Sequence, residues 1–99
     1  MKVVIENNDN QITALLSGEI DHHTASVIRE TVDDNVIRAR PQKLILDFSG
    51  VTFTDSSGIA VVLGRYKLLK SINGSLECRG MNTQVKKLFD LSGINRFII

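Results

Sequence analysis

The sequence predicts a small α/β domain in which helices pack on a mixed, mostly parallel sheet. Five short segments have the apolar or alternating pattern of strands: residues 2–6, 11–17, 43–48, 75–79 and 96–99. Three segments with helical patterns lie between the last four strands: residues 24–39, 56–72 and 83–92. Strands joined through helices need crossover connections and therefore run parallel. Only the turn-forming residues 7–10 separate the first two strands, so we expect a hairpin with an antiparallel edge strand.

Length and composition predict one compact domain over residues 1–99. The chain is 42% hydrophobic and 23% charged, and it has no apolar run of the roughly 20 residues needed to cross a bilayer. Its N-terminal residues do not look like a signal peptide, and a lone cysteine, Cys78, cannot form an internal disulfide. We therefore expect a cytoplasmic protein without membrane contact, in which Cys78 is a buried apolar side chain. The net charge of +1 argues against direct binding of nucleic acid.

The first predicted helix has clear boundary signals. Asp21 and Thr24 are both candidates for capping its start, and Pro41 prevents its continuation. After the strand at residues 43–48, residues 49–54 are interpreted as a bend that leads into the second helix.

The second predicted helix carries more apolar residues than one buried face requires. Its main face comprises Ile59, Val62, Leu63, Tyr66 and Leu69, whereas Val61, Leu68 and Ile72 lie to one side with Arg65 among them. We expect these additional residues to pack on the third helix; the alternative is that they face a binding partner. Gly64, in mid-helix, costs about 1 kcal/mol relative to Ala. We favour close internal packing over close approach by a partner as its explanation.

Asp55-Ser56-Ser57-Gly58 places serines in the first turn of the second helix, where backbone N–H groups lack partners. A phosphate on Ser56 would meet these donors and the positive end of the helix dipole, a gain of about 0.3–1 kcal/mol when exposed. Phosphorylation would therefore change the surface charge by about −2 without unfolding the domain. The alternative is that Asp55 or Ser56 is only a helix N-cap, and the four-residue pattern taken alone favours that alternative.

A hydrolase that uses Ser56 with His22 or His23 is a second class of function. The sequence disfavours it, because Thr54 stands where a G-x-S-x-G elbow would have its first glycine. A compact domain of this length also leaves little room for a base, an oxyanion hole and a substrate pocket. We therefore expect no enzymatic activity, no cofactor and no metal site.

Four segments together give a resemblance to a known family. They are Gly18-Glu19-Ile20-Asp21-His22-His23-Thr24-Ala25, Leu46-Asp47-Phe48 with Phe53-Thr54-Asp55-Ser56-Ser57-Gly58, Leu63-Gly64-Arg65-Tyr66-Lys67, and Val85-Lys86-Lys87-Leu88-Phe89-Asp90-Leu91-Ser92-Gly93. In this order they resemble the STAS domain of the bacterial anti-anti-sigma factors, or anti-sigma factor antagonists. The sporulation type, which controls the forespore sigma factor, is the most similar. Family members usually continue into a C-terminal helix, and because this chain stops at Ile99 we expect that helix to be absent.

The resemblance implies a phosphorylation switch. The unmodified protein would bind an anti-sigma factor that is also a serine kinase, with its nucleotide bound, and would thereby release the sigma factor. The kinase would phosphorylate Ser56, and a serine phosphatase would reverse the modification. The partner surface implied by the family consists of Asp21, His22, Thr24, Asp55, Ser57, Gly58 and Arg65. We expect a monomer when the protein is free. The alternative within the family is a non-switching STAS module that assembles into larger signalling particles.

Overall fold

The computed structural model describes residues 1–96. Its elements are β1 (Lys2–Asn8), β2 (Gln11–Ile20), α1 (His22–Ala39), β3 (Lys43–Thr54), α2 (Ser56–Ser71), β4 (Ser75–Arg79), α3 (Thr83–Ser92) and a short 3₁₀ helix, η1 (Ile94–Arg96). The predicted α/β class is confirmed. No helix among residues 1–96 is long and apolar enough to span a membrane.

The strands of the described part of the chain form one mixed sheet in the order β1-β2-β3-β4. β1 pairs with β2 in antiparallel orientation, as predicted, through a turn in which Asp9 and Asn10 have φ of 47° and 69°. Two-residue hairpin turns require such positive angles, and Asp and Asn tolerate them better than most residues. β2 pairs in parallel with β3, and β3 with β4. α1 and α2 provide the crossovers that these parallel pairs need.

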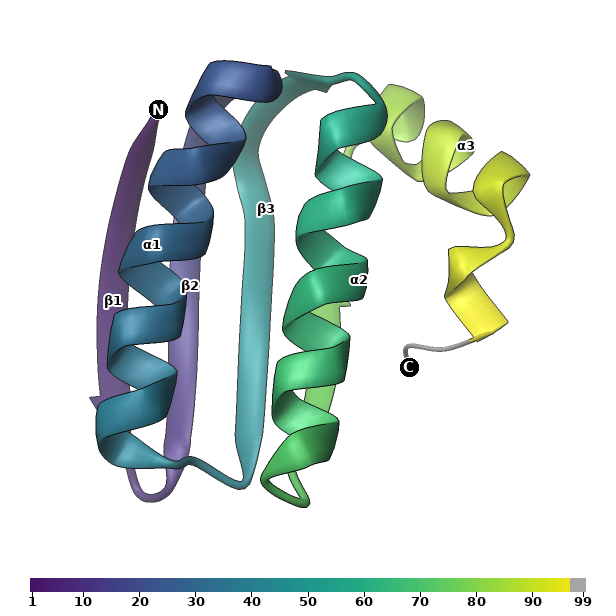
Figure 1. Ribbon diagram of the computed structural model, residues 1–99. Coiled ribbons are helices and arrows are strands. Elements are labelled where there is room, and N and C mark those ends of the chain that lie inside the picture. Colours follow the sequence, from purple (N-terminus) through teal and green to yellow (C-terminus); the bar gives the residue numbers. More distant parts are fainter. Residues whose placement is uncertain (97–99) are drawn as a thin grey trace.

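The core lies between one face of the sheet and two helices. α1 and α2 run side by side over this face, and α3 lies beyond α2 near the end of β3 (Figure 1). Alternate residues of β2 and β3 point into the core, as the period-two side-chain pattern of a strand requires. The fully buried core residues include Ile12, Ala14 and Ile20 of β2, Leu44, Leu46 and Phe48 of β3, and Ile28, Val32 and Val36 of α1. Phe48 also packs edge to face on Phe89 of α3, with ring centroids 5.7 Å apart.

Two predicted segments are corrected by the structure. Residues 49–54 continue β3 instead of bending. Gly50 makes this possible, because it pairs with Ser17 beside a register shift, where an added Cβ would lie 2.6 Å from the Cβ of Ser17. Arg96, predicted to begin a last strand, instead ends η1, which follows a left-handed turn at Gly93 (φ 77°). The rest of that predicted strand, residues 97–99, lies outside the described residues.

The predicted main face of α2 packs on the core, with Val62 and Leu69 fully buried, but two of the residues expected beside it have a different role. Val61 and Arg65 are buried, and they line a groove against α1 instead of packing on α3. The reason is that α1 and α2 lie side by side, whereas α3 lies at the end of the sheet (Figure 1). A Cβ added to Gly64 would meet nothing within 4 Å. Close internal packing, the explanation favoured from sequence, is therefore wrong for Gly64.

Candidate functional site

Two helices start together at one end of the sheet, and the sheet register sets their separation. Ile20, the last residue of β2, pairs with Thr54, the last residue of β3, and the backbone N–H of Asp55 donates to the carbonyl of Ile20 at 3.1 Å. Asp21 and Asp55 follow directly and are the N-caps of α1 and α2. Because neighbouring strands lie about 4.8 Å apart, both acidic caps lie close to each other at this end of the sheet.

Asp21 and Thr24 form a reciprocal cap at the start of α1. The backbone N–H groups of His23 and Thr24 both donate to Oδ1 of Asp21 at 2.9 Å, and the N–H of Asp21 donates to Oγ1 of Thr24 at 2.8 Å. The hydroxyl of Thr24 also donates to the carbonyl of Glu19 at 2.8 Å. The hydrogen bond from the Thr24 N–H is the main cause that holds the pKa of Asp21 below its usual value. Both residues proposed as caps from sequence thus take part in the capping.

Ser56 is exposed and occupies the first position of α2. Asp55, and not Ser56, is the N-cap, because its Oδ1 accepts a hydrogen bond from the N–H of Ser57 at 2.8 Å. The prediction of an exposed serine at the start of a long helix is therefore confirmed, and α2 has 16 residues. A group attached to Ser56 would project into solvent at the N-terminal, positive end of the α2 dipole.

Gly58 has an internal packing role. It is buried, and a Cβ at this position would lie 2.1 Å from Oγ1 of Thr54, which is itself buried. The Thr54 hydroxyl donates to the carbonyl of Asp55 at 2.9 Å, which fixes it at the junction of β3 and α2. Gly58 therefore allows the start of α2 to pack closely on the end of β3. This internal packing explains why the residue is a glycine, without any approach by a partner.

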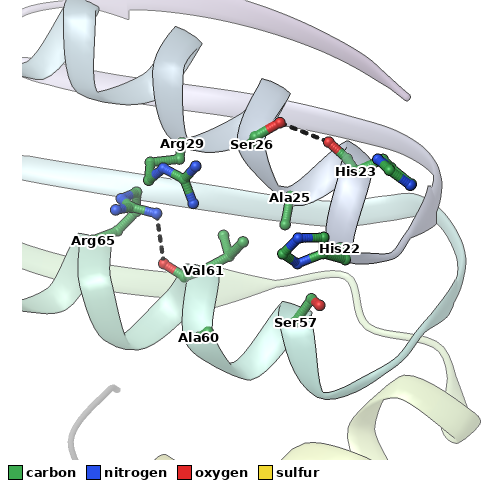
Figure 2. A pocket seen from close by; sticks show the side chains of 9 residues that line it. All are labelled: His22, His23, Ala25, Ser26, Arg29, Ser57, Ala60, Val61 and Arg65. Carbon is green, nitrogen blue, oxygen red and sulfur yellow. Dashed lines mark hydrogen bonds between the residues drawn. The ribbon is translucent and has the colours of Figure 1, made fainter.

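A groove of about 300 Å³ lies between the N-terminal halves of α1 and α2. It is lined by His22, His23, Ala25, Ser26, Arg29, Ser57, Ala60, Val61 and Arg65 (Figure 2). His22 and His23 are exposed, with their rings edge to face at 5.9 Å. Ser57, and not Ser56, lines the groove, and within residues 1–96 no hydrogen bond links a histidine side chain to either serine.

Arg65 is buried at the side of this groove. Its Nε lies 2.9 Å from Oδ1 of Asp33 on α1, with side-chain exposures of 7% and 26%, and its Nη1 donates to the carbonyl of Val61 at 3.2 Å. Burial lowers the pKa of Arg65 and raises the pKa of Asp33, and in both cases it outweighs the attraction between the two groups. The structure thus places Arg65 in an ion pair between the helices, and not on an exposed face.

Sequence reasoning missed three residues around this site. Arg29 and Asp33 lie one helical turn apart on α1, and only the packing of α1 on α2 reveals that they flank Arg65. Phe53, the penultimate residue of β3, is 51% exposed although it is a large aromatic residue. Exposed aromatic side chains are typical of protein interfaces, and Phe53 is three residues before Ser56 in the chain. No local signal marks Phe53, because burial does not alternate in this part of β3: Val51 and Thr54 are buried, whereas Phe53 is exposed beside a register shift between β2 and β3.

The fold and these contacts define a small α/β domain whose candidate functional residues gather at the carboxyl ends of two neighbouring parallel strands. The STAS domain family matches residues 2–99, and the chain belongs to that family.

Relatives in this family include antagonists of anti-sigma factors. The chain is 34% identical over 94 residues to the anti-sigma F factor antagonist of Paenibacillus polymyxa, covering 95% of this chain and 80% of the relative. It is 30% identical over 98 residues to the anti-sigma-B factor antagonist of Bacillus subtilis (strain 168), covering 99% and 88%. Both F- and B-type antagonists match, so the similarity does not distinguish the forespore type expected from sequence.

Solved structures of similar proteins share the fold. The anti-sigma factor antagonist SpoIIAA in its unphosphorylated form superposes with a TM-score of 0.86 at 27% identity, covering 99% of this chain and 86% of SpoIIAA. The Bacillus cell fate determinant SpoIIAA in the phosphorylated form gives a TM-score of 0.77 at 26% identity, covering 99% and 89%. The similarity therefore extends over nearly the whole of this chain.

Proposed function

We propose that this chain is an anti-sigma factor antagonist that is switched by phosphorylation at Ser56. In the cytoplasm, the unphosphorylated monomer binds a nucleotide-bound anti-sigma factor that is also a serine kinase, and it releases the sigma factor. Phosphorylation ends this binding, and a serine phosphatase restores it. The observation that carries the proposal is the exposed Ser56 at the first position of α2, beside two acidic caps, in a member of the STAS family.

The partner surface extends from the caps to the groove. It comprises Asp21, His22 and Thr24 at the start of α1 and Asp55, Ser57 and Gly58 at the start of α2, with Arg65 inside the groove. Thr24, Asp55 and Gly58 act mainly by fixing the backbone on which the exposed groups stand. The exposed aromatic ring of Phe53 adds a residue that could anchor the partner.

The switch acts through charge. A phosphate adds a charge of about −2 at a site that already has Asp21 and Asp55 close by. The positive end of the α2 dipole stabilises the phosphate, so the modification has no reason to unfold α2. An acidic partner group about 6 Å away would be repelled by about 3 kcal/mol per pair of unit charges at an effective dielectric constant near 20. Solvent and salt reduce this value, but a remaining ~1.4 kcal/mol is a tenfold loss of affinity.

The test is incubation with the cognate anti-sigma kinase and ATP, followed by intact-mass measurement. We expect one added phosphate in the wild type and in Ser57→Ala, and none in Ser56→Ala. Turnover of ester substrates that depends on Ser56 would instead favour a hydrolase, and stable large assemblies without phosphate would favour a scaffold module.

The mechanism is tested on the phosphorylated protein through its circular dichroism melt and its affinity for the kinase. We expect an unchanged melt with much weaker binding, constitutive binding by Ser56→Ala, and a smaller loss of binding for Ser56→Asp, which carries half the charge. A collapsed melt or an unchanged affinity would contradict the charge mechanism.

A further inference from the structure

The groove between α1 and α2 has more positive charge than the fold itself neutralises. Arg65 is paired with Asp33, and Arg29 is close enough to affect the pKa values of both groups. Two guanidinium groups therefore act on one carboxylate, which within the described part of the chain pairs with Arg65 alone and is itself partly desolvated. Arg29 makes no ion pair of its own among residues 1–96.

The shape of the groove suits a short acidic side chain. The guanidinium groups of Arg29 and Arg65 lie at one end, His22 and Ser57 lie at the other, and Ala25 and Val61 lie between them (Figure 2). An apolar middle section can cover the methylene groups of an entering side chain, while the planar guanidinium groups match the geometry of a carboxylate. The nearby start of α2 adds positive partial charge at the Ser57 end.

We propose that this groove receives an aspartate or glutamate side chain of the anti-sigma partner, with its carboxylate bound by Arg29 and Arg65. The inference rests on the proposed function and specifies the chemistry of the partner at that surface. A carboxylate bound by Arg65 would lie nine residues along α2 from Ser56, a rise of about 13 Å. It is therefore a partner contact separate from the acidic group that a phosphate on Ser56 would repel.

The proposal is tested by the affinity of the unphosphorylated chain for the nucleotide-bound kinase, measured by isothermal titration calorimetry. We expect about tenfold weaker binding for Arg29→Ala, which removes the attraction between the two charges. We expect about hundredfold weaker binding for Arg29→Glu, which replaces the attraction with repulsion. Arg38→Ala is the matched control, since Arg38 is an exposed arginine on the same helix that does not line the groove, and its affinity should be unchanged. Arg29 is exposed, so melts of all variants should match the wild type.

A double-mutant cycle then identifies the partner group. Each Asp and Glu on the partner's binding surface is replaced by Ala, and one of them should couple to Arg29 by about threefold or more in affinity. Equal affinities of the wild type and Arg29→Ala, or no coupled acidic residue, would overturn the proposal. An effect of Arg29→Ala confined to the phosphorylated form would assign the groove to the phosphate on Ser56 and would also overturn it. If the wild type does not bind the kinase at all, the proposed function itself is refuted.

Discussion

Replacing Gly58 by Ala should disturb the junction that presents Ser56. The added Cβ would lie 2.1 Å from Oγ1 and 3.1 Å from Cβ of Thr54. Thr54 cannot retreat easily, because it is paired with Ile20 in the sheet, and turning its hydroxyl away would break its bond to the carbonyl of Asp55. Overpacking of this kind costs about 1–3 kcal/mol. Ala is better than Gly in a helix by about 1 kcal/mol, which offsets part of the cost. We expect a net loss of about 1 kcal/mol.

This loss is measured by urea unfolding followed by circular dichroism, and in a thermal melt it should lower Tm by about 4–8 °C. Gly64→Ala is the matched control on the same helix: its Cβ meets nothing, so it should stabilise the domain by up to about 1 kcal/mol. In a Thr54→Ala background, which lacks the clashing hydroxyl, Gly58→Ala should cost much less. Wild-type stability of Gly58→Ala, or the same cost with and without the Thr54 hydroxyl, would refute the steric argument.

Three further predictions concern ionisable side chains. Asp33→Ala should destabilise the domain by about 3 kcal/mol in urea unfolding, because it leaves Arg65 buried without a partner. Asp34→Ala is the control and should change the stability little, because Asp34 is exposed. A loss for Asp33→Ala no larger than that of Asp34→Ala would contradict the prediction. Asp21→Asn keeps a capping acceptor but removes the charge. Since the folded state lowers the pKa of Asp21, its charged form stabilises the fold above the usual carboxyl pKa, and this contribution disappears as pH falls through the lowered value. The urea midpoints of Asp21→Asn and wild type should therefore differ at pH 7 and converge towards pH 2, and a constant difference would count against this. Burial raises the pKa of Cys78 to about 12, so a disulfide reagent at pH 7 should react slowly until urea unfolds the domain; rapid reaction of the native protein would show that the thiol is accessible.

Much of the fold could be predicted because local signals and tertiary structure agree. Residues 75–79 form β4 as expected, and the hairpin follows from a turn cluster that tolerates positive φ. The Ser49-Gly50 pair is a turn signal by itself, yet Gly50 lies inside β3, because a register shift between β2 and β3 places it against Ser17, where a side chain would not fit. A neighbouring strand determines that outcome, and the local sequence does not contain it.

The candidate site shows the same division. Ser56 and its acidic caps could be located from sequence because helix starts have chemical signatures. The burial of Arg65 could not be predicted from periodicity, because it depends on which flank of α2 faces α1. Asp33, its partner, lies 32 positions earlier in the chain and has no local feature that marks it.

The register that joins Ile20 to Thr54 also affects the entropy of association. The spacing of the two helix starts is held by central strand pairing, so the surface is already ordered before any partner arrives. Binding that must order a flexible loop loses about 0.5–1.5 kcal/mol for each immobilised side chain. A surface held by the sheet avoids much of that loss. In the proposed switch, one phosphate on Ser56 would therefore change the affinity directly, without being absorbed by loop rearrangement.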